Sequence, residues 1–109
     1  MNRAAAKAWL SRETAATSEP RLGSEDLDAL LDEAAGVSAG AEAEFTLPML
    51  NRAASRGWVW KANAAAEYHG RESEIYQHCV ERERHYRARA TGGGAVARSA
   101  DPVSVEALR

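Results

Sequence analysis

Hydrophobic side chains recur at helical spacing in four stretches of the chain, and glycines or polar residues separate these stretches. The clearest pattern occupies positions i, i+3, i+4, i+7 and i+8, as on one face of an amphipathic helix: Leu27, Leu30, Leu31, Ala34 and Ala35. Ser24 is a suitable N-cap for this helix, and the acidic residues Glu25 and Asp26 follow in the first turn, where the helix dipole favours negative charge. Gly36 is a typical C-terminal stop. The pattern predicts a helix over residues 24–35.

Two further helices are expected on either side of it. Residues 3–13 form the first, with one face made by Ala5, Ala8, Trp9 and Arg12. Thr46 can cap a longer helix that has Pro48 in its first turn and ends at Gly70. Its stripe consists mostly of small residues: Leu50, Ala53, Ala54, Gly57, Lys61, Ala64, Ala65 and Tyr68. Small side chains on one face allow another helix to approach closely, which gives Gly57 a packing reason.

A fourth helix is expected from Glu74 to Ala90, with Ser73 as its N-cap. Its seam is formed by Ile75, Cys79, Arg82 and Tyr86, with Tyr76 and Val80 beside it. We expect Glu81 with His85, and Glu83 with Arg87, on the outer face at i,i+4 spacing. Three glycines at 92–94 end this helix. The sequence therefore predicts an all-α protein: a small four-helix bundle over residues 1–90 and an extended, glycine-hinged C-terminal arm over residues 91–109.

Composition supports the helical assignment and limits the core. Alanine provides 24 of the 109 residues, whereas Leu, Ile, Val and Phe together provide only 16. β-branched and aromatic residues are too scarce for a β-sandwich or barrel. The expected core is thin, which favours stabilisation by partners.

Charge is balanced overall but divided along the chain. The net charge of −2 separates into −5 for residues 1–46 and +3 for residues 47–109. A chain with one acidic and one basic half can meet copies of itself head to tail, as in rings. The alternative is two solvated helical surfaces that merely differ in composition.

The residues that commonly carry chemistry do not form a recognisable site. His69, His78, Cys79 and His85 have spacings that do not suit tetrahedral zinc, and Cys79 on the apolar seam is typical of a small hydrophobic residue. The pattern offers neither a nucleophile with a base nor a phosphate-binding loop, so we predict no catalytic residue, no metal, no cofactor and no enzyme activity. No stretch reaches 18 consecutive apolar residues, so we expect no membrane span.

Arginines and tryptophans are the remaining candidates for binding. Arg82, Arg84, Arg87 and Arg89 could contact phosphate, but Glu81 and Glu83 alternate with the first two of them, which suits a solvated, ion-paired face better than a phosphate-binding patch. A small regulatory or nucleic-acid-binding helical protein therefore stays as the alternative. Trp58 and Trp60 face about 160° apart on a helix, so one can fill the core while the other meets a neighbour.

Two segments resemble a known family. Residues 8–14 (AWLSRET) and 22–31 (LGSEDLDALL) are similar to the opening of the small head–tail connector, or adaptor, proteins of long-tailed bacteriophages. Residues 51–62 (NRAASRGWVWKA) resemble the long helix pair of the same family, especially in phages of actinobacteria. The likeness continues at Ala64, Ala65, Ala66, Glu67, Tyr68, Ser73, Tyr76, Cys79 and Tyr86. It covers about residues 4–90.

This resemblance implies a structural virion protein at the neck, assembled in the host cytoplasm. Such adaptors form a ring, usually dodecameric, that joins the portal to the next connector or tail protein and surrounds viral DNA without reading its sequence. The resemblance implies that the arm clasps the portal through Val96, Arg98, Val103, Val105 and Leu108. We expect the subunit interface to use Glu25, Asp28, Asp32, Trp58, Arg82, Arg84 and Arg87.

Overall fold

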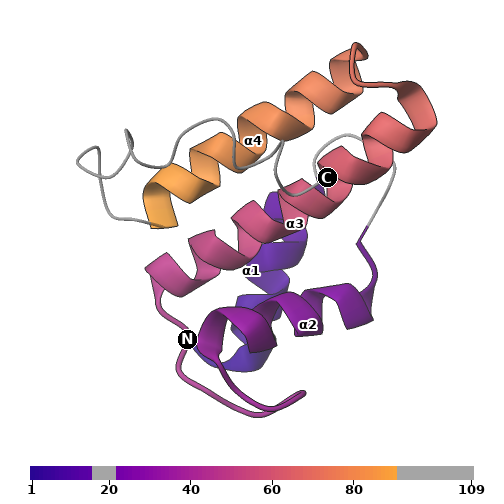
Figure 1. The fold of residues 1–109 in the computed structure, drawn as a ribbon. Helices are drawn as coiled ribbons and strands as arrows, with labels where there is room; N and C mark the ends of the chain where they lie inside the picture. Colours follow the sequence, from indigo (N-terminus) through magenta and orange to yellow (C-terminus); the bar gives the residue numbers. More distant parts are fainter. Residues whose placement is uncertain (16–21, 91–109) are drawn as a thin grey trace.

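The computed structural model describes residues 1–15 and 22–90, which form a small all-α bundle as the sequence predicts. Its helices are α1 (Arg3–Ala15), α2 (Ser24–Ala35), α3 (Leu47–His69) and α4 (Glu74–Ala90). The long helix α3 lies in the middle, with α4 antiparallel along one side and α2 antiparallel on the other, while α1 crosses behind α2 and α3 (Figure 1). The predicted C-terminal arm lies outside the described residues.

The helix ends follow local signals that were readable in the sequence. The hydroxyl of Thr46 accepts a hydrogen bond from the backbone N–H three residues further on, at 3.4 Å, and the hydroxyl of Ser73 accepts the equivalent bond at 3.1 Å. Gly36 ends α2 in the left-handed conformation, with φ 68°. Two ends differ from the prediction: α1 continues to Ala15, two residues further than expected, and α2 begins at Ser24 itself, with Gly23 in the N-cap position.

The buried face of α1 is a correction to the sequence analysis. The expected face, Ala5, Ala8, Trp9 and Arg12, is exposed apart from the half-buried Trp9. The residues that α1 buries are Ala6, Leu10 and Thr14, at i, i+4 and i+8. In an alanine-rich helix the polar and apolar faces differ little in hydrophobicity, so the pattern left the orientation of this helix undetermined.

Helix α3 forms the centre of the core and is buried on several sides. The stripe predicted for it is buried at Leu50, Ala53, Ala54, Gly57, Lys61 and Ala65. Five residues outside the stripe are buried as well: Asn51, Ser55, Trp58, Val59 and Ala62. The last member of the stripe, Tyr68, is 73% exposed and lies beyond the packed part of the helix.

Other segments pack closely on α3 at Gly57, as its place in the small-residue stripe predicted. A Cβ atom at this position would lie 3.1 Å from Leu22, 3.2 Å from Leu30 and 3.3 Å from Thr14. These side chains come from the segment before α2, from α2 and from α1. The absence of a side chain at Gly57 therefore lets three parts of the chain meet on one helix.

Candidate functional site

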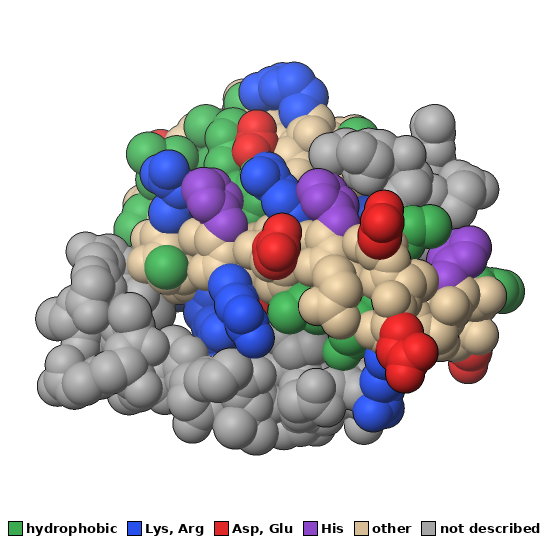
Figure 2. Space-filling model, turned by 90° about the horizontal axis from the view of Figure 1, so that it is seen from above, with side chains coloured by type: hydrophobic (Ala, Val, Ile, Leu, Met, Phe, Trp, Pro, Cys, Tyr) green, Lys and Arg blue, Asp and Glu red, His purple; other side chains and the backbone are tan. Residues whose placement is uncertain are grey.

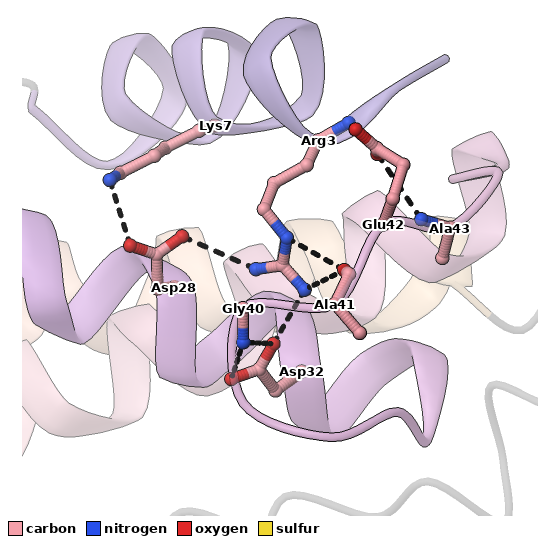
Figure 3. Close-up of polar contacts among 8 residues, drawn as sticks. All are labelled: Arg3, Lys7, Asp28, Asp32, Gly40, Ala41, Glu42 and Ala43. Atoms are coloured by element: carbon pink, nitrogen blue, oxygen red, sulfur yellow. Dashed lines mark hydrogen bonds and ion pairs between the residues drawn. The ribbon is translucent and has the colours of Figure 1, made fainter.

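The acidic face of α2 is engaged by the N-terminal helix of the same chain (Figure 3). The guanidinium of Arg3 donates to Asp32 at 2.6 Å and to Asp28 at 3.2 Å, and the ammonium of Lys7 donates to Asp28 at 2.8 Å. The hydrogen bond from Lys7, together with that from Arg3, holds the pKa of Asp28 below its ordinary value of 3.8. Asp28 and Asp32 were expected to pair with a neighbouring subunit, but the structure pairs them inside the chain.

Arg3 also fastens the connection between α2 and α3. Its Nε donates to the Ala41 carbonyl at 2.9 Å, and its backbone N–H donates to the Glu42 carboxylate at 2.8 Å. Asp32, the partner of Arg3, accepts a further bond from the backbone N–H of Gly40 at 3.1 Å. We call Arg3, Lys7, Asp28, Asp32 and residues 40–42 the Arg3 clamp. Its contacts give these charged residues a structural role, because they join α1, α2 and the loop.

A second polar cluster joins the end of α1 to α4. The Tyr86 hydroxyl donates to the carboxylate of Glu13 and accepts a hydrogen bond from Arg82 at 2.6 Å. The indole N–H of Trp58 donates to the Glu13 carbonyl at 3.2 Å, and the Arg82 guanidinium lies 5.9 Å from the Trp58 ring centroid. Burial, with the Glu13 hydrogen bond, raises the pKa of Tyr86 to about 12. This cluster is internal, so it fixes the packing of α1 against α3 and α4.

Trp58, which was expected at a subunit interface, has its side chain inside the bundle. Its side chain is fully buried and therefore offers no surface to a neighbour, whereas Trp60 is partly exposed. Arg82, also expected at the interface, is half-buried and turned toward Tyr86. The helical spacing correctly separated the two tryptophans, but only the packing of the other helices decides which one points inward.

Glu83 is likewise on the inside and not on the outer face of α4. It is 2% exposed, and its carboxylate accepts a hydrogen bond from the Ser55 hydroxyl at 2.9 Å. The expected i,i+4 ion pair with Arg87 is present at 3.6 Å, so Arg87 too is directed toward a partner in its own chain. Of the arginines considered for phosphate binding, Arg84 and Arg89 are the fully exposed ones.

The outer face of α4 carries charges of both signs (Figure 2). Its exposed positions are Glu74, Gln77, Glu81, Arg84, His85, Ala88 and Arg89. Glu25, at the start of α2, is also exposed. Of the residues proposed for the subunit interface, Glu25 and Arg84 are the ones whose side chains lie fully at the surface.

A groove between α2 and α3 was not anticipated from the sequence. Its floor is formed by Leu30, Ala34 and Ala53, its volume is about 240 Å³, and its rim carries Arg52 and Arg56. Glu33 completes the lining and lies 3.5 Å from the Nε of Arg56. We call this feature the α2–α3 groove. The i,i+4 spacing of the two arginines places them on one side of α3, but only the packing of α2 creates a cavity beside them.

The histidines and the cysteine do not come together with other ligand-type residues. Among residues 1–15 and 22–90, no three side chains of His, Cys, Asp and Glu form a group that could hold a metal ion. Cys79 is buried in the core as expected, and burial raises the pKa of its thiol. Desolvation and the nearby Arg89 and Arg82 lower the pKa of His85.

No helix in the described part of the chain is long and apolar enough to cross a membrane. The residues expected to bind the portal lie outside the described residues: Val96, Arg98, Val103, Val105 and Leu108. Comparison with family models, with curated proteins and with solved structures finds no match to this chain.

Proposed function

We propose that this chain is a structural virion protein, a head–tail adaptor of a tailed bacteriophage. Copies of it form a ring around the DNA exit channel and join the portal to the next connector or tail protein. The proposal starts from the sequence resemblance over residues 4–90. It is supported by the all-α fold and by the way the exposed charges are distributed.

The strongest support is the separation of exposed charge along the α3 axis. Because α4 runs antiparallel to α3, its start lies at the end of α3 and its end lies over the beginning of α3 (Figure 1), whereas the start of α2 lies opposite the middle of α3, where Leu22 approaches Gly57. Exposed Glu67 and Glu74 therefore share one end of the bundle, and Glu25 and Asp26 lie nearer its middle. Exposed Arg84 and Arg89 lie toward the other end.

Charges elsewhere at these two ends are largely compensated. At the basic end, the N-terminal ammonium of Met1 pairs with the carboxylate of Glu44 at 2.8 Å. At the acidic end, Arg71 and Glu72 of the α3–α4 turn offset each other in charge. A head-to-tail contact requires two different, complementary surfaces on each copy, and unlike charges at opposite ends meet this requirement.

The inward direction of Arg82 and Arg87 weighs against the alternative of a dedicated nucleic-acid-binding protein. A phosphate-binding surface needs several exposed cations that can release counterions. On α4 the fully exposed cations are Arg84 and Arg89, and exposed Glu81 lies on the same helix. A surface with so few exposed cations is better suited to a channel wall, along which DNA slides, than to a binding site that holds DNA.

Quantitative mass spectrometry of purified tailed particles tests the proposal by counting this chain against the portal protein. A ratio near one to one is expected for matched rings at the neck. Absence of the chain from particles would refute the adaptor function. Deletion of residues 91–109 should then leave a folded bundle that no longer joins the portal. If the truncated chain is still found on portals in the normal amount, the arm does not make the portal contact.

A further inference from the structure

The α2–α3 groove has the size and lining of a site for one aromatic side chain. Its volume of about 240 Å³ exceeds the roughly 150 Å³ of a protein cavity that admits benzene. Leu30, Ala34 and Ala53 supply an apolar floor. An aromatic ring placed there would leave water and lie on aliphatic side chains.

The rim of the groove is suited to a carboxylate beside that ring. Arg52 donates a hydrogen bond from one guanidinium nitrogen to the Ala34 carbonyl at 3.0 Å, and Arg56 lies 3.5 Å from Glu33. A guanidinium has five N–H donors, so these contacts leave donors for a further acceptor. Its planar face can also stack on an aromatic ring.

The chain displays a matching pair of side chains at the end of α3. Tyr68 is 73% exposed, and the adjacent Glu67 is also exposed. In the described part of the chain, no hydrogen bond or ion pair engages either side chain. Tyrosine provides a large apolar surface with a polar tip and is enriched among the residues that dominate binding energy at protein interfaces.

Groove and tyrosine cannot meet within one molecule. Arg56 and Tyr68 are 12 residues apart on the same helix, which separates them by about 18 Å along its axis. A straight helix keeps this distance fixed. Any contact between the two features therefore requires a second copy of the chain.

We propose that Tyr68 of one copy inserts into the α2–α3 groove of the next copy, where the adjacent Glu67 pairs with Arg52 and Arg56. This contact rests on the proposed function, because it supplies the subunit interface of the ring. Exposed charges at the two ends of the bundle steer the copies toward each other but contribute little affinity. The buried tyrosine ring is the anchor that fixes the register between neighbours.

Sedimentation velocity of the full-length chain over a range of concentrations, together with native mass spectrometry, tests this contact. The variant Tyr68→Ala should weaken self-association about tenfold or more, while His69→Ala, a neighbouring exposed change, should leave it unaltered. Circular dichroism confirms that each variant keeps its helices. All of these positions are at the surface, so folding is preserved.

A charge exchange distinguishes a direct contact from a general effect of charge. Glu67→Arg and Arg56→Glu should each weaken association, and the double variant should recover a large part of it. Glu72→Arg, with the same change in net charge nearby, serves as the control.

A wild-type chain that stays monomeric at every concentration would overturn the proposal, as would unchanged association of Tyr68→Ala or a double variant no better than the single ones. Each of these results would show that Tyr68 does not bind in the groove. Failure of the adaptor function is recognised separately, by the absence of the chain from tailed particles.

Discussion

The Arg3 clamp provides a quantitative test of what holds the N-terminal helix in place. Helix α1 buries only three residues, Ala6, Leu10 and Thr14. Such a small apolar face makes the polar contacts of Arg3 important, and its side chain is only 12% exposed. The substitution Arg3→Met removes the guanidinium and keeps an aliphatic side chain of helical propensity similar to that of arginine.

The expected loss is about 2 kcal/mol of unfolding free energy. A hydrogen bond to a charged group contributes roughly 1.5–3 kcal/mol, whereas an exposed ion pair contributes about 0.2–1 kcal/mol. The contacts of Arg3 lie between these limits, because Asp32 is 19% and Asp28 35% exposed. Lys7 makes a single ion pair with Asp28 and is itself 31% exposed, so Lys7→Met should cost only about 0.5 kcal/mol.

Urea unfolding followed by circular dichroism measures both variants. With a slope of about 1–3 kcal/mol per molar urea, Arg3→Met should lower the midpoint by about 1 M and Lys7→Met by much less. The pKa of Asp28 is lower in the folded state, so its stabilisation is present above about pH 4 and is lost as the pH falls through the folded pKa. The two variants should therefore approach the wild type in acid. Equal losses for Arg3→Met and Lys7→Met at neutral pH would refute the structural role of the clamp.

Three further substitutions test the interior. The raised pKa of Tyr86 stabilises the fold below pH 10, and this stabilisation is lost as the pH rises through about 12. In the Tyr86→Phe variant this loss at alkaline pH should be absent, as thermal unfolding measured at several pH values will show. Gly57→Ala should destabilise the bundle by about 1 kcal/mol, since contacts with three segments outweigh the better helix propensity of alanine; a raised melting temperature would contradict this. Glu83→Gln should cost about 1–3 kcal/mol in urea unfolding, because it removes the buried charge that pairs with Arg87 at 3.6 Å and strengthens the bond from Ser55. The exposed Glu81→Gln should stay within about 0.5 kcal/mol of the wild type, and equal effects would show that Glu83 is not buried in solution.

The helices and their ends could be predicted because their signals are local. A capping hydroxyl such as that of Thr46 or Ser73 acts on a backbone N–H three residues away, so sequence neighbours suffice to specify it. The same holds for Gly36, whose left-handed conformation depends on its own missing side chain. The leucine stripe of α2 was also readable, because leucines and acidic residues contrast strongly along that helix.

The features that could not be predicted from the sequence depend on which helix lies opposite each residue. The alanine-rich α1 lacks contrast between its faces, so only its packing on α2 and α3 decided that Leu10 points inward. Glu83 has the pattern of a surface residue, but Ser55 on α3 offers its carboxylate a partner inside the bundle.

The sequence by itself determined the four helices, their boundaries to within two residues, and the division of charge between the two halves of the chain. Tertiary structure alone decided that Trp58 is buried, that Asp28 and Asp32 form ion pairs with α1, and that a groove opens beside Arg56. The physical reason is the distance along the chain over which each interaction acts. Capping, propensity and periodicity act over a few residues, whereas burial and ion pairing are settled by side chains brought together from distant parts of the chain.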